Sequence, residues 1–125
     1  MSESLTHEDV EHFAALLDAR EASDRAQVER LTVDIAEVTA ATRDVPADDE
    51  HDPEGSTATL ERAREVALLA STEKALADIA AARARLAAGT YGTCASCGNP
   101  IPRERLEIRP EAQYCVTCAA KRRRA

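Results

Sequence analysis

Apolar residues recur at alternating spacings of three and four positions over the first third of the chain, from about His7 to Arg43. This spacing places them on one face of a helix and predicts a seam that a partner helix buries. Arg20 and Asp24 stand between an earlier and a later block of these residues, so the seam is interrupted or shifts phase there. The seam positions are Val10, Phe13, Leu17, Val28, Leu31, Ile35 and Val38.

A second helical pattern follows an acidic segment at residues 44–56, where two prolines, a glycine and many carboxylates favour a turn or loop. The helix is expected to resume either at Pro53, with Asp52 as its N-cap, or just after the Gly55-Ser56 pair. It then continues without proline or glycine until Gly89, the expected C-cap residue. Its apolar side is expected to carry Leu60, Val66, Leu69, Leu76, Ile79 and Leu86.

Two helices of similar length joined by a short loop pack as an antiparallel hairpin. Composition agrees with this, because the chain has 26 alanines and only three aromatic residues, which suit long helices better than a thick globular core. The pattern therefore predicts a mostly α fold. An antiparallel coiled-coil hairpin is expected over residues 1–90, with an acidic tip loop near 44–56, and a small C-terminal domain is expected over residues 91–125.

All the cysteines of the chain lie in this C-terminal domain, as two C-x-x-C pairs separated by 17 residues. Two such turns can close a tetrahedral cage of four thiolates around one Zn²⁺ ion, and Gly98 allows the turn after the first pair. The other interpretations are two disulfides or a redox dithiol, although a redox pair usually occurs once in a βαβ context that is absent here. The zinc would be structural, since no coordination position is left for water or substrate. The expected ligands of this C4 zinc ribbon are Cys94, Cys97, Cys115 and Cys118.

Charge is divided unevenly along the chain. Residues 1–90 carry 9 basic and 20 acidic side chains, a net charge of −11, whereas residues 91–125 carry 7 and 3, a net charge of +4. The two values sum to the formal charge of −7 for the whole chain. Nucleic-acid-binding domains usually carry a broad basic face, so sequence-specific DNA binding is not expected.

Several classes of protein are disfavoured by what the sequence lacks. No apolar run approaches the ~20 residues that span a bilayer, so no membrane association is expected. The first residues show no secretory signal pattern, and together with reduced cysteines this predicts a cytoplasmic location. No nucleophile elbow, P-loop or open metal site occurs, so an enzyme is not expected.

The C-terminal segment resembles the DksA/TraR family of C4 zinc-finger transcription regulators. The resemblance is carried by residues Tyr91 to Gly98, Ile101, the Arg105-Leu106 and Arg109-Pro110 pairs, and Cys115 to Cys118. The resemblance covers roughly 30 residues, and the preceding hairpin of some 80 residues agrees with the family architecture. It implies direct binding to bacterial RNA polymerase, with the hairpin inserted into the secondary channel. Some members act together with guanosine tetraphosphate, so a linkage to this nucleotide is a further expectation.

The resemblance also implies that an acidic tip approaches the polymerase active site, and Asp49, Asp52 and Glu54 are the candidate tip residues. The best-studied tip has an Asp, a second Asp three residues later and an Ala two further. From Asp49 the corresponding positions are Asp52 and Glu54, and from Asp52 they are Gly55 and Thr57, so neither frame reproduces the pattern. The alternative is that the acidic loop is only a solvated linker.

Two other functions are kept open: a nucleic-acid-binding zinc ribbon, and a structural coiled-coil adaptor that dimerises along its seam. The basic run at residues 121–124 could contact nucleic acid or an acidic protein surface, but a frayed, solvated terminus is slightly favoured. Tyr91 is expected to pack beside the zinc. The expected small core of the ribbon consists of Ile101, Leu106, Ile108 and Tyr114.

Overall fold

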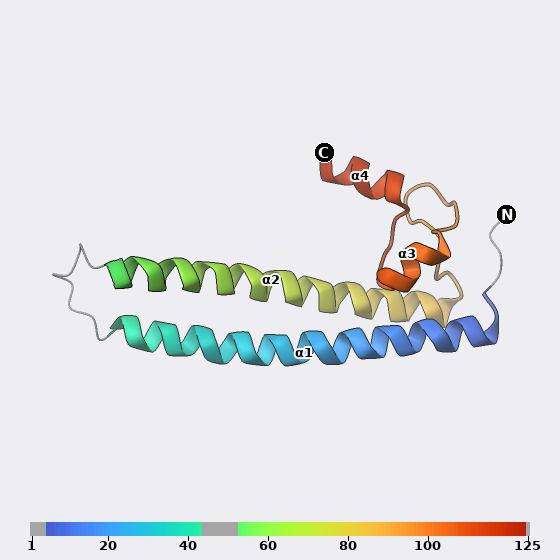
Figure 1. Ribbon diagram of the computed structural model, residues 1–125. Coiled ribbons are helices and arrows are strands. Elements are labelled where there is room, and N and C mark those ends of the chain that lie inside the picture. Colours follow the sequence, from blue (N-terminus) through green and yellow to red (C-terminus); the bar gives the residue numbers. More distant parts are fainter. Residues whose placement is uncertain (1–4, 44–52, 125) are drawn as a thin grey trace. The chain divides into compact units, whose positions relative to one another are not determined.

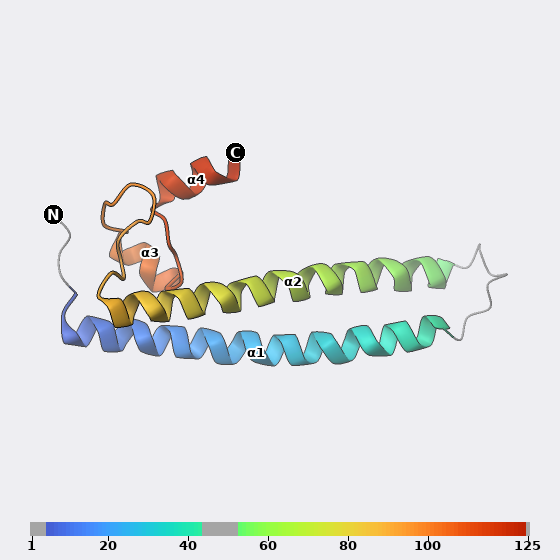
Figure 2. The same ribbon diagram turned by 180° about the vertical axis from the view of Figure 1, so that it is seen from behind.

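The structure is a computed structural model that describes residues 5–43 and 53–124, except for the side chains of residues 42, 43, 53–56 and 124. Its described part contains four helices: α1 (His7–Arg43), α2 (Pro53–Ala88), α3 (Arg103–Ile108) and α4 (Val116–Arg124). The long helices α1 and α2 form the expected hairpin and lie side by side in both views (Figures 1 and 2). The mostly helical fold class is therefore confirmed.

Local sequence signals set the ends of the long helices. Before α1, the Thr6 hydroxyl accepts a hydrogen bond from the backbone N–H of Asp9 at 3.0 Å, and the Asp9 carboxylate accepts one from the N–H of Thr6 at 3.1 Å. This reciprocal capping box satisfies two N–H groups that the helix itself cannot pair. Helix α2 begins at Pro53, which agrees with the first of the two predicted starts.

The end of α2 is a Schellman motif around Gly89. Gly89 has a φ of 79° and donates its N–H to the Leu86 carbonyl, while Thr90 donates to the Arg85 carbonyl at 2.9 Å. Only glycine adopts this left-handed conformation without steric cost, so Gly89 ends the helix as predicted. The chain turns here into the C-terminal module, defined as residues 91–124.

The described chain divides into two compact units. The first unit comprises Met1–Ala22 and Ala75–Ala125, and it therefore holds the start of α1, the end of α2 and the C-terminal module. The second unit comprises Ser23–Lys74, the remaining parts of the two long helices. This division into compact units does not test the predicted domain boundary near residue 90, which stays a prediction.

The first unit has one buried apolar cluster, to which α1, α2 and the C-terminal module all contribute. Phe13 and Leu17 of α1 have no exposed surface, and Ile79 of α2 is 1% exposed. The centroids of the Phe13 and Tyr91 rings lie 5.4 Å apart. The cluster consists of Phe13, Leu17, Ile79, Ala82, Tyr91, Cys94, Ile101, Leu106 and Cys118. Burying these apolar groups together supplies most of the stability of such a small unit.

The second unit has a thinner and more polar seam. Leu31 is buried, and the buried hydroxyl of Thr72 accepts a hydrogen bond from Gln27 Nε2 at 2.8 Å while donating one to the Leu68 carbonyl. These bonds keep polar groups in the seam satisfied. The prediction was wrong for Leu60 and Val66, which are 60% and 46% exposed.

The C-terminal module contains two short helices and, among its described residues, one isolated β-bridge between Thr93 and Pro100 instead of strands. Its expected core is confirmed for Ile101 and Leu106 and wrong for Ile108, which is 70% exposed. The slightly favoured frayed, solvated terminus is confirmed in its exposure, since residues 121–123 are exposed, but it is helical, because residues 121–124 continue α4. Among the described residues, no helix has the length and apolar character needed to cross a membrane.

Candidate metal centre

The four cysteines converge on one point in the first unit. All are free thiols, and their Sγ atoms lie within 4.8 Å of one another. The Sγ atoms of Cys97 and Cys115 are 3.9 Å apart, about twice the length of a disulfide bond. The geometry therefore does not support the two-disulfide interpretation. In the part of the chain that the structure describes, no other group of three or more His, Cys, Asp and Glu side chains is placed to hold a metal ion.

The backbone around each pair explains this convergence. After the first pair, Gly98 has a φ of 75° and donates its N–H to the Cys94 carbonyl at 3.0 Å, which closes a tight turn. The second pair spans the start of α4, where Ala119 donates to the Cys115 carbonyl at 2.9 Å. A hydrogen bond from the N–H of Ala95 to the Gln113 carbonyl at 2.8 Å ties the two segments together. Each C-x-x-C pair thus presents both thiols on one side of a turn.

Hydrogen bonds and burial shift the pKa values of two of the thiols. Burial by itself raises the pKa of the Cys94 thiol, but hydrogen bonds from the backbone amides of Cys97, Cys115 and Ser96 outweigh burial and lower that pKa to about 6. The pKa of Cys118 is instead raised to about 12, first by a hydrogen bond with the Cys115 thiol and then by burial. The pKa values of these two thiols are thus shifted in opposite directions, by hydrogen bonds and burial within the site.

The donor set fits one structural Zn²⁺ ion. Four thiolates at a Zn–S distance of about 2.3 Å have their sulfur atoms about 3.8 Å apart in a tetrahedron. The 3.9 Å between Cys97 and Cys115 matches that spacing. Bound zinc would supply the positive charge that keeps four thiolates together, and it would leave no position open for a substrate.

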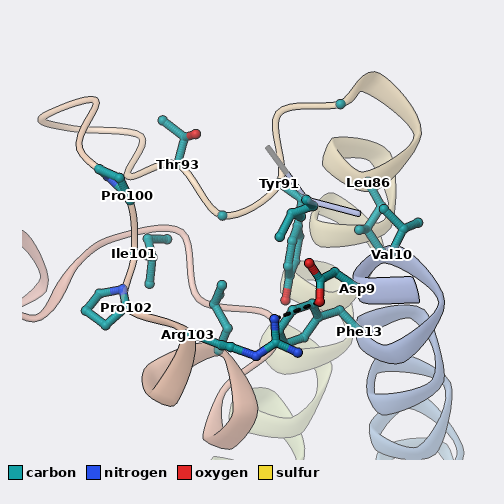
Figure 3. Close-up of a pocket in the computed structure, with 14 residues that line it drawn as sticks. Asp9, Val10, Phe13, Leu86, Tyr91, Thr93, Pro100, Ile101, Pro102 and Arg103 are labelled. Carbon is teal, nitrogen blue, oxygen red and sulfur yellow. Dashed lines mark hydrogen bonds and ion pairs between the residues drawn. The ribbon is translucent and has the colours of Figure 1, made fainter. Parts of the chain in front are cut away.

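Helix α3 carries the contacts that join the C-terminal module to the start of α1. Arg103 Nη1 donates to Asp9 Oδ1 at 2.7 Å, and the Arg103 guanidinium lies 5.2 Å from the centre of the Phe13 ring. Figure 3 shows Arg103 reaching from α3 to Asp9, with Phe13 beside the pair. This hydrogen bond is the main cause that lowers the pKa of Asp9 from 3.8 to about 2. His12 Nε2 adds a second link, because it lies 2.8 Å from both carboxylate oxygens of Glu107.

A second set of contacts lies at the other end of α3. Arg20 donates to the Ile108 carbonyl, and its guanidinium is 3.6 Å from the Glu111 carboxylate. The sequence placed Arg20 at an interruption of the seam, and the structure gives the reason: this side chain serves the C-terminal module. Tyr91 donates its hydroxyl to the Pro110 carbonyl at 2.6 Å, and burial raises its pKa. Tyr91 therefore has a structural role in the module.

A cavity of about 570 Å³ lies between the start of α1 and the C-terminal module. Its wall includes Leu5, Val10 and Leu86 together with the Arg103–Asp9 pair, whose charges already neutralise each other (Figure 3). It adds no nucleophile or metal-ligand set to the cysteine site.

The candidate tip residues are not part of this unit. Asp49 and Asp52 lie outside the described residues, and Glu54 lies in the first turn of α2 without a described side chain. Their role stays a prediction. The sequence interpretation also missed the contacts of Asp9, His12 and Glu107. The sequence contained a signal for these contacts. Asp9 and His12 are three residues apart in one helix, and Arg103 and Glu107 are four apart in another, so each pair lies on one helix face.

Comparisons with known proteins agree with this geometry. Residues 89–124 match the family model of the prokaryotic DksA/TraR C4-type zinc finger. An uncharacterized protein of Aquifex aeolicus (strain VF5) is 43% identical over 44 residues, which cover 35% of this chain and 30% of the relative.

A solved structure matches almost the whole chain in fold. It is the transcription factor DksA2 from Pseudomonas aeruginosa, with a TM-score of 0.75 and 24% identity, over 96% of this chain and 87% of that one. The resemblance seen in the sequence is confirmed: the segment that holds the cysteine site matches the DksA/TraR C4-type zinc finger, and the chain has a DksA-like fold.

Proposed function

We propose that this protein is a transcription regulator that binds RNA polymerase by inserting its helical hairpin into the secondary channel. The observation that carries the proposal is the fold match to the transcription factor DksA2 over 96% of this chain, together with the matching zinc finger at residues 89–124. The protein acts without catalysis, in the cytoplasm. The zinc site is structural. It stabilises the C-terminal module, which packs against the start of α1 and the end of α2.

The proposal gives the long helices and the segment between them different tasks. The faces of α1 and α2 supply contact area within the channel, and the zinc finger fixes the base of the hairpin. The carboxylates of Asp49, Asp52 and Glu54 approach the catalytic magnesium site of the polymerase. Carboxylates near a bound Mg²⁺ ion change the local electrostatics without needing to form a ligand set of their own.

Polymerase binding is tested by co-precipitation of purified bacterial core enzyme with the zinc-loaded chain, with and without guanosine tetraphosphate. A second secondary-channel factor, added as competitor, should displace the chain. The informative variant is A70P, because Ala70 is exposed on α2 and a proline in the interior of a helix breaks it at a cost of roughly 3 kcal/mol or more. The matched control A70G costs only about 1 kcal/mol at the same position.

Wild type and A70G should bind the core enzyme, whereas A70P should bind at least tenfold more weakly while retaining its zinc. Binding that survives competition by another secondary-channel factor would reject this route of entry. Equal binding by A70P and A70G would show that an intact hairpin is not needed, and no binding by the wild type would remove the proposed function altogether.

A further inference from the structure

The C-terminal module carries cations that have no carboxylate partner among the described residues. Three other arginines of the first unit pair with acidic side chains: Arg20 with Glu111, Arg83 with Asp18 and Arg103 with Asp9. On α4, in contrast, three consecutive cations are exposed and make no ion pair within the described chain. We call Arg105, Lys121, Arg122 and Arg123 the basic surface.

Tyr114 joins the two parts of this surface. The Nε of Arg105, from α3, donates to the Tyr114 carbonyl at 2.9 Å. The guanidinium of Arg122, from α4, lies over the Tyr114 ring at 4.5 Å from its centre. Tyr114 thus anchors two arginines from different helices, and the terminal guanidinium nitrogens of both make no hydrogen bond or ion pair with the described residues. Helix α4 is the red element next to the C-terminus in Figure 1.

The helix dipole explains part of the clustering of cations on α4, but it does not explain the contacts of Arg105 and Arg122 with Tyr114. Positive side chains in the last turn of a helix are stabilised by the helix dipole. That effect favours one or two cations in the last turn, and it gives no reason for Arg105 of another helix to meet Arg122 at Tyr114. Ionised side chains without a partner keep their full capacity for an external anion.

Phosphate is the anion that best suits this surface. Guanidinium groups bind phosphate oxygens through two parallel hydrogen bonds, and arginine prevails here over lysine. Stable protein interfaces instead need apolar anchors surrounded by a polar rim. The C-terminal half of α4 offers none, because Val116, its exposed large apolar residue, lies in the first turn. Lys121, Arg122 and Arg123 lie within a single turn of α4 and point in different directions around it, so their long side chains can contact more than one phosphate of a nucleic acid.

We propose that the basic surface binds the phosphodiester backbone of nucleic acid without reading its sequence. The net charge of −11 on residues 1–90 confines this contact to the C-terminal module and keeps it weak. The contact does not depend on polymerase. Three neutralised phosphates on duplex DNA give a slope of about −2.7 in log K against log salt, or about a 40-fold loss of affinity between 50 and 200 mM salt.

The test is fluorescence anisotropy with the full, zinc-loaded chain and no polymerase. The probes are a labelled 20-base-pair DNA duplex, the single strand of the same sequence, and an RNA strand of that sequence. The variant K121Q/R122Q/R123Q removes the three exposed cations of α4. The control R30Q/R62Q/R64Q removes the same charge from three exposed arginines of the long helices.

Wild type and the control should bind a probe with the stated salt dependence, and the α4 variant should bind at least tenfold more weakly. Zinc content and far-UV circular dichroism check that the α4 variant is folded, and R123Q alone should show a smaller loss if the triple variant is not. Absence of wild-type binding at 50 mM salt, or equal losses in both triple variants, would overturn the proposal. So would an α4 variant that binds nucleic acid normally but fails to bind polymerase, since the basic surface would then serve a protein.

Discussion

Arg103 is the side chain through which the zinc finger touches the first turns of α1. Its guanidinium bonds to Asp9, lies over the Phe13 ring and is 3.6 Å from Glu107 of its own helix. Asp9 in turn belongs to the capping box that starts α1. A single exposed pair of this kind contributes little stability, so its value lies in fixing where α3 meets α1.

The pKa of Asp9 gives a direct measure of this contact. The pKa is lowered to about 2, first by the hydrogen bond from Arg103 and second by the backbone N–H of Thr6. Since the folded value lies below the ordinary 3.8, the contribution to stability is complete above about pH 4 and is lost as the pH falls toward 2. In R103Q the Asp9 pKa should rise toward 3.8, as measured by NMR of the carboxyl carbon.

Replacement of Arg62, an exposed arginine of the second unit, serves as the control and should leave the Asp9 pKa near 2. An Asp9 pKa that stays near 2 in R103Q would assign the effect to the Thr6 cap and remove Arg103 from the contact.

At the scale of the elements, the ends of the helices could be predicted because the signals are local. Pro53 begins α2 and Gly89 ends it, each through its own backbone preferences. The metal site could be predicted for the same reason, since two C-x-x-C turns bring their thiols together whatever surrounds them. Periodicity also located the hairpin, because seams of Leu and Phe at three-four spacing need a partner.

The exposed faces could not be predicted from the same pattern. Leu60 and Val66 fit an apolar stripe by type, but both are exposed, whereas Leu69, Thr72, Leu76 and Ile79 are buried or partly buried along α2. Ile108 ends a helix of six residues whose direction depends on Arg20 and Arg103, which are contacts between distant segments. Such long-range choices override the preference of a single residue for burial.

The shared core of the first unit predicts a coupling between helix packing and zinc retention. Phe13 and Cys94 belong to one buried cluster, whereas Leu31 lies in the second unit. F13A should lose about 3–5 kcal/mol of stability and L31A about 2–5 kcal/mol, each by leaving a cavity. Only F13A should release zinc faster to a colorimetric chelator, with C94S as the reference for a lost ligand. Equal release rates in F13A and L31A would show that the metal site is independent of the hairpin.

On the scale of the whole molecule, charge separates the chain into two regions with opposite sign. The zinc finger and its tail carry +4, and the preceding 90 residues carry −11. The two proposals use these regions for different partners, the hairpin for polymerase and the basic surface for phosphate. The two proposals can be rejected independently, because polymerase binding is measured with core enzyme and nucleic-acid binding is measured without it.

The acidic segment between α1 and α2 gives the last prediction. If Asp49, Asp52 and Glu54 act near the catalytic magnesium of polymerase, the variant D49A/D52A/E54A should still bind core enzyme, since the long helix faces supply most of the contact. Its effect on transcription in vitro should nevertheless differ from that of the wild type, because the local field at the magnesium site changes. The control E29A/E37A/E61A removes the same charge from exposed positions on the two long helices and should act as the wild type does. Identical transcription with both triple variants would reduce the acidic segment to a linker, while loss of binding in the first would make it a contact instead of an electrostatic element.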